Sequence, residues 1–449
     1  MAIDLGNIIE GEIIDFTHEG NGVLKIDNFA IFVPGGIIGD KVKVEIKQIK
    51  RNYGIGSIIE IIKPSKDRID LEFNLTEAKG GIPLIEYKYE KQLKWKRDKV
   101  KIDLHKIADL KQAEVKETIG MDDPFKYRNH VQIPVGQRGE EPIIGFYEAN
   151  SRNIVDMDSS ILQPDIGNII IDIIRKWMKK YKIKAYDKKS KKGILRHIGI
   201  RINRDNQAMV ILVTGNNNLP KKEELIEELK KESIVSIYQN INKSNTSMTY
   251  GREYRKLYGE DTLLDYIGEY KFNISPNSFF QVNRIQAEEL YNKTMDYLEL
   301  DKDDIVYDLY CGIGTISLYI ADKAKKVYGI EIVKEAINDA KENAKLNNIT
   351  NVEFIVGKAE EIFSKMMKRG IKGNKVVIDP PRKGCEKEVL EGMVKLNPER
   401  IVYVSCNPTT MARDIKYLVG NSYVVKEVQP VDMFPHSAHV ETICLMSKK

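Results

Sequence analysis

From about residue 283 onward, short apolar runs alternate with helical segments, and this pattern constrains the fold more than any other feature of the chain. Strands that alternate with helices build a parallel sheet whose connections are right-handed crossovers. The sequence therefore predicts a C-terminal α/β domain of the nucleotide-binding type. Its expected strands are 305–309, 326–330, 352–356, 375–378 and 401–404, with two more before Lys448.

The first 62 residues have a different pattern, in which β-rich runs are separated by glycine-containing turns. Gly20-Asn21-Gly22 and Pro34-Gly35-Gly36 are turns of this kind, and close-set strands joined in this way are typical of a small barrel. Such barrels often bind single-stranded nucleic acid, although the shape alone does not establish that function. Five strands are expected, at 8–14, 23–26, 29–33, 41–49 and 54–62.

The region between these two domains mixes helix and strand patterns, so we interpret it as α+β. A charged helix is expected over 87–108 and an exposed helix over 220–232, with strand-like runs at 131–134, 194–202 and 209–214. Because domains of about 100 to 200 residues are common, a chain of 449 residues accommodates several. The expected domains are a barrel at 1–62, a central α+β domain at 63–275 and the α/β domain at 276–449.

Positive charge is concentrated in one segment of the central region. The chain carries a net charge of +5, yet the segment from Arg175 to Arg196 has eleven Lys and Arg residues against one acid. Trp177, Tyr181 and Tyr186 lie between these cations, a combination that suits RNA because bases can stack while phosphates are neutralised. The alternative is a solvated lysine-rich loop.

The cysteines and the N-terminus indicate the compartment. The four cysteines lack the short paired spacing of a zinc or iron–sulfur site, and a reducing cytoplasm fits best. The N-terminus has no signal-peptide pattern, and no apolar run approaches the roughly 20 residues that span a bilayer. We therefore expect no membrane partner, and no obligate protein partner is indicated. The cysteines are Cys311, Cys385, Cys406 and Cys444.

A glycine-containing loop follows the first expected strand of the α/β domain. In Asp308-Leu309-Tyr310-Cys311-Gly312-Ile313-Gly314-Thr315 the glycines allow backbone to approach a ligand, and Glu331, at the end of the next strand, can hold the two ribose hydroxyls of an adenosine. Ser317 stands where a dinucleotide fingerprint has its third glycine. This difference favours S-adenosylmethionine, which has no pyrophosphate, over NAD. The alternative is a merely structural turn.

Three further groups lie later in the chain. Asp379-Pro380-Pro381-Arg382 follows the fourth strand, at the sheet edge where such folds bind ligands, and Arg382 is poorly suited to stack a base where an aromatic residue would do so. Cys406 lies in the turn Ser405-Cys406-Asn407-Pro408, and Glu441 follows His439-Val440. A lone thiol and a carboxylate are what an enzyme needs to form a carbon-carbon bond on a pyrimidine. The alternatives are a buried cysteine, a loop carboxylate and a surface acid.

Together with the segment 274–283, these motifs resemble the RNA 5-methyluridine methyltransferases, and the resemblance spans essentially the whole chain. The first 60 residues are similar to the TRAM barrel of the ribosomal-RNA branch. The resemblance implies that Cys406 is the nucleophile and Glu441 the general base. It also implies a class I S-adenosylmethionine-dependent methyltransferase domain, whose site is lined by Gln281, Tyr310, Gly312, Glu331 and Asp379. His436 and His439 are expected to be structural, since no third metal ligand is evident.

The chemistry independently supports these two roles. Carbon-5 of uracil is a poor nucleophile, but addition of a thiolate at carbon-6 produces an enolate whose carbon-5 can attack a sulfonium methyl. A base must then remove the carbon-5 proton before the thiol leaves. A positioned base of this kind contributes about 10²- to 10⁴-fold.

One departure from the family pattern concerns iron. Many bacterial relatives hold an iron–sulfur cluster with three cysteines before the central helix and a fourth later, and thiolates are what binds such a cluster. No cysteine stands at these places here, so we expect no iron–sulfur cluster. The corresponding positions are Lys79, Ile82, one near Phe73, and Ser159 or Ser160.

The predicted function is methylation of uridine carbon-5 in structured RNA, with 23S ribosomal RNA as the first candidate because the barrel resembles the ribosomal branch. Transfer RNA is the nearest rival substrate. A non-catalytic RNA-binding or assembly factor that retains the fold is the alternative from a different class.

Overall fold

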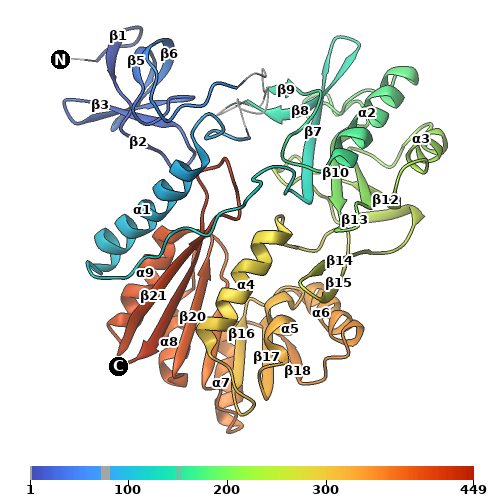
Figure 1. The fold of residues 1–449 in the computed structure, drawn as a ribbon. Coiled ribbons are helices and arrows are strands. Elements are labelled where there is room, and N and C mark those ends of the chain that lie inside the picture. Colours follow the sequence, from blue (N-terminus) through green and yellow to red (C-terminus); the bar gives the residue numbers. More distant parts are fainter. Residues whose placement is uncertain (1–2, 72–80, 149–150, 152) are drawn as a thin grey trace.

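The computed structural model describes residues 3–71, 81–148, 151 and 153–449, apart from the side chains of residues 364 and 367. Figure 1 shows three parts: an N-terminal barrel, a central domain, and a C-terminal domain on which the other two stand. In the described part of the chain, no helix is both long and apolar enough to cross a membrane.

The N-terminal part is a six-stranded antiparallel and parallel sheet with the order β1-β5-β6-β4-β3-β2. The five expected runs all form strands, and a two-residue strand, β2, adds a sixth. Alternate residues of these strands point inward and form a small apolar core that includes Leu24, Ile31 and Val44. The strands are β1 (Ile8–Glu12), β2 (Asp15–Phe16), β3 (Gly22–Ile26), β4 (Phe29–Val33), β5 (Lys41–Ile49) and β6 (Tyr53–Lys63).

The central domain is a seven-stranded sheet with the order β13-β12-β11-β10-β7-β8-β9, covered by helices α2 and α3. Helix α2 was not expected, because its last turns coincide with the basic segment and the charge concealed the apolar face. Its elements are α1 (Tyr89–Ala108), β7 (His130–Arg138), β8 (Glu141–Tyr147), β9 (Ile154–Asp156), α2 (Asp165–Lys180), β10 (Leu195–Ile202), β11 (Ala208–Thr214), α3 (Lys222–Leu229), β12 (Ile234–Ile241) and β13 (Glu253–Gly259).

Of the three aromatic residues of the basic segment, Trp177 is a packing group, whereas Tyr181 and Tyr186 are half-buried. Trp177 is buried, and its indole N–H donates to the carbonyl of Lys221 at 2.8 Å. The guanidinium of Arg196 lies 5.2 Å from the ring centroid of Tyr186. The expectation that bases stack on these rings is therefore wrong for Trp177, since the folded core already occupies its faces.

The C-terminal domain is a doubly wound sheet with the order β18-β17-β16-β19-β20-β22-β21. Strands β16 to β20 are parallel, and β22 pairs antiparallel with β20 and β21. The strands are β16 (Ile305–Leu309), β17 (Lys326–Glu331), β18 (Val352–Val356), β19 (Lys375–Ile378), β20 (Arg400–Ser405), β21 (Tyr423–Val431) and β22 (Glu441–Lys448). The seven expected strands are all present.

Helices cover both faces of this sheet, so its strands are apolar on both sides. Tyr307 and Leu309 point to one face, which α1, α7, α8 and α9 cover, whereas Val306 points to the other, which α4, α5 and α6 cover. The helices are α4 (Arg284–Leu298), α5 (Thr315–Ala321), α6 (Lys334–Leu346), α7 (Ala359–Lys368), α8 (Lys387–Leu396) and α9 (Pro408–Val419).

Two elements of the expected central region pack on the C-terminal domain. The hairpin of β14 (Leu263–Ile267) and β15 (Tyr270–Ile274) lies against α4, α5 and α6. Helix α1 lies along α9. We therefore propose that the boundary of the C-terminal unit lies before Leu263 rather than at 275, while the barrel ends near 62.

Candidate active site

The register of two strands brings Cys406 and Glu441 together. In the antiparallel pair of β20 and β22, Ser405 lies opposite Thr442. Continuing this register by one residue places Cys406 opposite Glu441, and side chains of directly opposed residues lie on the same face. The turn after β20 is fixed by Asn407, whose side chain caps α9 by accepting the N–H of Thr409 at 3.2 Å.

Cys406 is the half-buried cysteine of the chain, whereas the three other thiols are buried. Burial, together with the nearby carboxylates of Glu441 and Asp379, raises the pKa of the Cys406 thiol to about 11, while Arg382 acts in the opposite direction. Burial also raises the pKa of both carboxyl groups well above their usual values, and the charge of Asp379 adds to the shift of Glu441. The charges of the two acids therefore influence the thiol and each other.

The segment that carries Asp379 docks on the turn that carries Cys406. The backbone N–H of Asp379 donates to the carbonyl of Leu309 at 3.3 Å, which holds it at the end of β19 beside the glycine loop. The carbonyl of Arg382 accepts from the side-chain amide of Asn407 at 3.0 Å and from the hydroxyl of Thr410 at 3.2 Å. Arg382 itself is exposed and faces the thiol side of the site.

The glycine loop and Glu331 form a corner at the point where the strand order reverses between β16 and β19, which is where such sheets bind ligands. One carboxylate oxygen of Glu331 accepts the N–H of Gly312 at 3.3 Å and the other accepts the N–H of Val333 at 2.9 Å. A Cβ on Gly312, whose φ is +53°, would meet no atom within 4 Å, so open space lies over this glycine. Ile332, which is 59% exposed, presents an apolar surface beside Glu331.

Asp308 lies at the same corner, buried in β16 just before the glycine loop. Its side chain is buried, and one carboxylate oxygen accepts the hydroxyl of Ser317 at 2.5 Å, while the other has no hydrogen-bond partner among the described residues. Burial, with contributions from Asp379 and Glu331, raises the pKa of Asp308 to about 7. An acid with an unpartnered oxygen just before the glycine loop suits a ligand that is a cation or a hydrogen-bond donor, which fits S-adenosylmethionine.

Gln281 and Tyr310 border this corner. The side chain of Gln281 hydrogen-bonds Tyr291, whose hydroxyl lies 2.9 Å from that of Thr315 at the start of α5. Tyr310 has a φ of +65°, which is uncommon for a residue other than glycine, and its hydroxyl hydrogen-bonds the thiol of Cys385. The structure thus brings Gln281, Tyr310, Gly312, Glu331 and Asp379 to one edge of the sheet, next to Cys406 and Glu441.

Helix α1 holds the segment that leads into Glu441. Lys96 and Asp432 form a buried ion pair of 2.5 Å, and Lys96 also donates to the carbonyl of Phe434 at 3.1 Å. The amide of Gln92 accepts the N–H of His436 at 3.0 Å. The segment 432–440 is therefore fixed by the central region and not only by its own domain.

The two histidines of this segment are in different positions. His436 is buried, and its ring stacks on Phe125 with centroids 4.9 Å apart. His439 is half-buried beside a cavity, and burial lowers its pKa to about 4, with a contribution from Arg382. Among the described residues, no group of three His, Cys, Asp or Glu side chains is placed to hold a metal ion.

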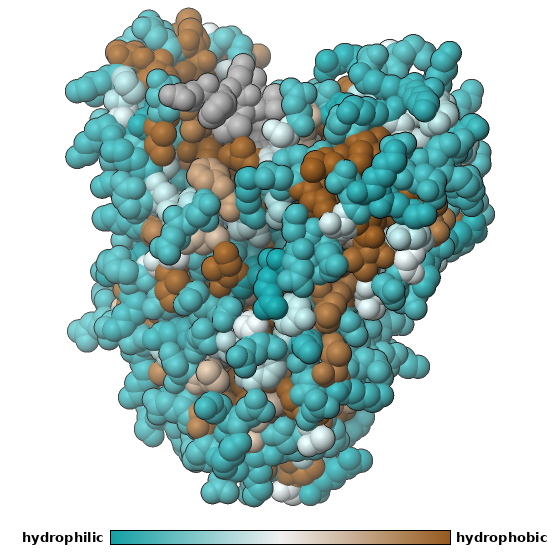
Figure 2. Space-filling view, turned by 45° about the vertical axis from the view of Figure 1, so that its right-hand side comes forward, coloured by the Kyte–Doolittle hydropathy of each residue, from teal (hydrophilic) through white to brown (hydrophobic). Residues whose placement is uncertain are grey.

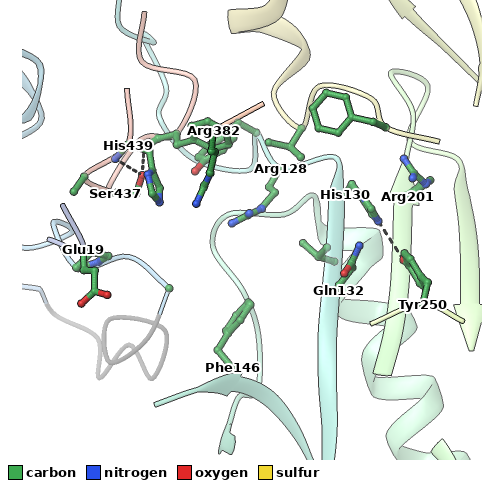
Figure 3. Close-up of a pocket in the computed structure, with 18 of the residues that line it drawn as sticks. Glu19, Arg128, His130, Gln132, Phe146, Arg201, Tyr250, Arg382, Ser437 and His439 are labelled. Carbon is green, nitrogen blue, oxygen red and sulfur yellow. Dashed lines mark hydrogen bonds between the residues drawn. The ribbon is translucent and has the colours of Figure 1, made fainter. Parts of the chain in front are cut away.

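A cavity of about 920 Å³ lies where the three domains meet. The barrel contributes His18 and Glu19, and the C-terminal domain contributes the segments 277–279 and 437–439 together with Arg382. Figure 3 shows Arg382 and His439 on one side of this cavity, with side chains of the central sheet on the other. Figure 2 shows a notch between the two upper lobes of the molecule. The central-sheet residues are His130, Val131, Gln132, Phe146 and Arg201, with Arg128 just before β7 and Tyr250 between β12 and β13.

Sequence reasoning missed most of these cavity residues. Arg128, His130 and Arg201 occur singly on or beside strands, with no motif around them. Only the pairing of β7 with β10, in which Arg201 lies opposite His130, brings them together. No local signal could have indicated this set.

The positions that correspond to the iron–sulfur ligands of relatives are partly described. Phe73 and Lys79 lie outside the described residues. Ile82 is buried in an apolar cluster with Met121, Tyr127 and Leu162, and the hydroxyl of Ser160 accepts the N–H of Leu162 at 3.3 Å. Aliphatic and hydroxyl side chains do not supply the thiolates that hold such a cluster, so these residues do not fit the group. The absence of a cluster stays a prediction, and an assay for labile iron and sulfide on anaerobically purified protein tests it.

The sheet order and the cofactor corner define the class of protein: this is an S-adenosylmethionine-dependent methyltransferase. Comparison with known proteins gives the family. Residues 253–449 match the family described as tRNA (Uracil-5-)-methyltransferase, and residues 6–59 match the TRAM domain. The chain belongs to the RNA uracil-5-methyltransferase family.

Relatives align along the whole length of the chain. An uncharacterized RNA methyltransferase of Clostridium tetani is 48% identical over 432 residues, which are 96% of this chain and 94% of that protein. One from Clostridium acetobutylicum is 47% identical over 453 residues, covering 100% and 98%. Among solved structures, the tRNA (uracil-54, C5)-methyltransferase of Pyrococcus abyssi, in complex with S-adenosyl-L-homocysteine, is 28% identical with a TM-score of 0.79, covering 98% of this chain and 100% of that one.

Proposed function

We propose that this enzyme methylates carbon-5 of a uridine in RNA, with Cys406 as the nucleophile and Glu441 as the general base. The observation that carries the proposal is the register of β20 and β22, which sets the thiol opposite the carboxyl group beside a cofactor corner. Neither group lines the cavity, but its lining includes Arg382 and His439, which lie beside this pair, and we propose the cavity as the route by which the target base approaches.

The proposed reaction begins at the thiol. The sulfur of Cys406 adds to carbon-6 of uracil, forming an S–C6 bond and moving the ring electron pair toward carbon-5 and the O4 enolate. Once carbon-5 carries its new methyl group, Glu441 accepts the carbon-5 proton, the carbon-5/carbon-6 double bond re-forms, and the thiolate leaves. The raised pKa of Glu441 suits this task, because a base whose pKa lies closer to the working pH removes carbon-bound protons more effectively.

S-adenosylmethionine, when bound, supplies an electrophilic methyl group. Glu331 and Gly312 would hold its adenosine, with Gln281 and Tyr310 beside it. Asp308 would hold its cationic end, since this buried acid has a free oxygen. Asp379 lies between the cofactor corner and Cys406, where its carboxylate can accept a hydrogen bond from uracil N3–H.

The target base must leave its stack to reach the thiol, as in other enzymes that react at a base. The barrel at 1–62 and the central domain form two walls of the cavity, so we propose that both contact the RNA around the target. The arginines of the cavity give it the charge that RNA requires.

For the substrate, we propose 23S ribosomal RNA first, on the resemblance of the barrel to the ribosomal branch. The Pyrococcus abyssi tRNA enzyme favours the second candidate, transfer RNA, because it aligns over 98% of this chain, most of the barrel included. A barrel therefore does not by itself distinguish the two substrates.

The test is to map 5-methyluridine across total RNA from cells with and without the gene, with purified wild-type and Cys406→Ala protein as the in vitro pair. Loss of a ribosomal site supports the first candidate, and loss of a transfer-RNA site supports the second. An unchanged map, with RNA binding that is the same in wild-type and Cys406→Ala protein, would instead support a non-catalytic RNA-binding factor.

A further inference from the structure

The central wall of the cavity contains a buried cation that has no counter-ion among the described residues. Arg201 is 4% exposed, lies on β10 opposite His130 of β7, and lines the cavity. One of its terminal nitrogens donates to the carbonyls of Pro276, at 3.4 Å, and Ser278. Its Nε has no hydrogen-bond partner.

Three other shielded arginines of the described chain have carboxylate partners, whereas the buried Arg196 donates to the backbone carbonyls of Asn242 and Ser244 and lies outside the cavity lining. Arg68 pairs with Asp40, Arg175 with Asp156 at 2.8 Å, and Arg284 with Asp265 at 3.2 Å. No such ion pair is formed by Arg201 within the described residues, and the ionisable groups that act on its pKa are the tyrosines Tyr250 and Tyr254. A buried charge without a partner is costly. The site is therefore suited to an anion that comes from outside the folded chain.

The surroundings of Arg201 are neutral or positive. His130 is held neutral because burial and the nearby Arg201 and Arg128 lower its pKa, and its Nε2 lies 3.3 Å from the hydroxyl of Tyr250. Figure 3 shows His130, Tyr250 and Arg201 side by side, with Arg128 nearer to Arg382. Glu19, on the barrel side, is the acid among the residues that line the cavity.

We propose that Arg201 and Arg128 bind a backbone phosphate of the RNA next to the target uridine. A guanidinium presents parallel N–H donors that match a phosphate, and the tyrosine hydroxyl can donate a further hydrogen bond. Because the same cavity reaches Arg382 and His439 beside the catalytic pair, the anion that enters it is the substrate strand. This inference rests on the proposed function.

A different role for Arg201 would be to position the segment 276–281, whose carbonyls it contacts and which includes Gln281. The two roles give different results. A phosphate contact contributes to the salt dependence of RNA binding, whereas a positioning contact affects cofactor binding and leaves the salt dependence unchanged.

The experiment measures RNA binding to Cys406→Ala protein, which cannot form the adduct, between about 50 and 200 mM salt. The probe is a 23S or transfer-RNA fragment that the wild-type chain binds. Arg201→Gln and Arg128→Gln are each added, and Arg204→Gln is the matched control. Arg204 follows β10, is half-exposed, stacks on Tyr266 at 3.8 Å and lies outside the cavity lining.

We expect Arg201→Gln and Arg128→Gln each to weaken binding roughly tenfold at low salt and to reduce the slope of log K against log salt by about 0.7 to 1. Arg204→Gln should change neither quantity, and S-adenosylhomocysteine affinity should stay the same in all three. An unchanged salt slope, or a loss of S-adenosylhomocysteine binding in parallel with RNA binding, would overturn the inference. Because binding is measured without turnover, a failure of the methylation proposal would be seen separately, in the map of 5-methyluridine.

Discussion

The two sides of the catalytic corner carry opposite charge. On the cofactor side lie four carboxylic acids, Asp308, Glu331, Asp379 and Glu441, of which three have raised pKa values. On the cavity side lie the guanidinium groups of Arg128, Arg201 and Arg382. The difference corresponds to the two substrates, since the sulfonium of S-adenosylmethionine is a cation and RNA is a polyanion. Cys406 lies at the boundary, where both fields act on its thiol.

Substitution of the thiol should have the largest effect. Cys406→Ala removes the thiol that we propose activates carbon-5, so we expect methylation to fall by at least about 10³-fold. Binding of S-adenosylhomocysteine should be unchanged, because the cofactor corner is built from other residues. Methyl transfer to RNA and calorimetric titration measure the two quantities. Near-normal turnover of this variant would show that no covalent step takes place.

Loss of the proposed base comes next. Glu441→Gln retains the size of the side chain but cannot accept the carbon-5 proton, so turnover should fall about 10²- to 10⁴-fold. Because the thiol cannot leave before that proton does, a methylated protein–RNA adduct should accumulate, visible as a shifted band on a denaturing gel. Cys406→Ala/Glu441→Gln is the control that must give no band. A Glu441→Gln protein that turns over normally would assign the base to another group.

These two predictions rest on residues that the sequence already indicated, for a physical reason. Cys406, Asp379 and Glu331 each stand at the end of a strand, and strand ends of an α/β sheet meet at one edge whatever the loops do. The domain order, the seven strands of the C-terminal sheet and helix α1 were predictable from apolar runs of unmistakable period.

Contacts between distant segments could not be predicted in this way. In the sequence, Lys96 is one of many lysines on a charged helix. In the structure it is fully buried, because the segment after β21 lies against it. Arg201 reads as one arginine of a strand, and its missing counter-ion is apparent only when β7, β10 and the segment 276–278 are seen together. Such features depend on tertiary pairing and leave no local pattern.

The buried ion pair of Lys96 and Asp432 joins helix α1 to the segment that leads into Glu441. Lys96→Met leaves Asp432 buried without its partner, which should lower the free energy of unfolding by about 3–5 kcal/mol. Lys96→Met/Asp432→Leu should recover most of this loss, because it removes both charges together. Urea unfolding of the two variants measures the difference.

The control for this pair lies two residues away on the same helix. Lys94 pairs with Asp98 at 2.6 Å on the exposed face, so Lys94→Met should change stability by no more than about 1 kcal/mol. If Lys94→Met and Lys96→Met unfold alike, the buried pair does not fasten the two parts.

The position of Cys406 between the buried acids and Arg382 predicts how fast its thiol is alkylated. With a thiol pKa of about 11, the thiolate fraction, and so the rate of alkylation by iodoacetamide, should rise about tenfold per pH unit between pH 7 and 10. Glu441→Gln removes a negative charge and should increase the rate at pH 8, whereas Arg382→Gln removes a positive charge and should decrease it. Peptide mapping assigns the label to Cys406. An alkylation rate that does not depend on pH, or that is the same in both variants, would contradict the opposite effects of the carboxylates and of Arg382 on the thiol.

The smallest expected effect is on the relative affinities for S-adenosylmethionine and S-adenosylhomocysteine, which separate the contribution of the cofactor's charge from that of its shape. S-adenosylmethionine and S-adenosylhomocysteine share the adenosine and amino-acid groups, but only the first carries a sulfonium. Because the pKa of Asp308 is raised to about 7, this acid gains its negative charge as the pH rises from 6 to 8. The affinity for the sulfonium should therefore rise over this range relative to that for the thioether, by roughly three- to tenfold, as expected for a cation near a newly ionised carboxylate. Titration of both ligands at each pH measures the ratio, and Asp308→Asn should hold it constant. If the ratio of the two affinities did not change with pH in the wild-type protein, the charge of Asp308 would not contribute to binding of the sulfonium.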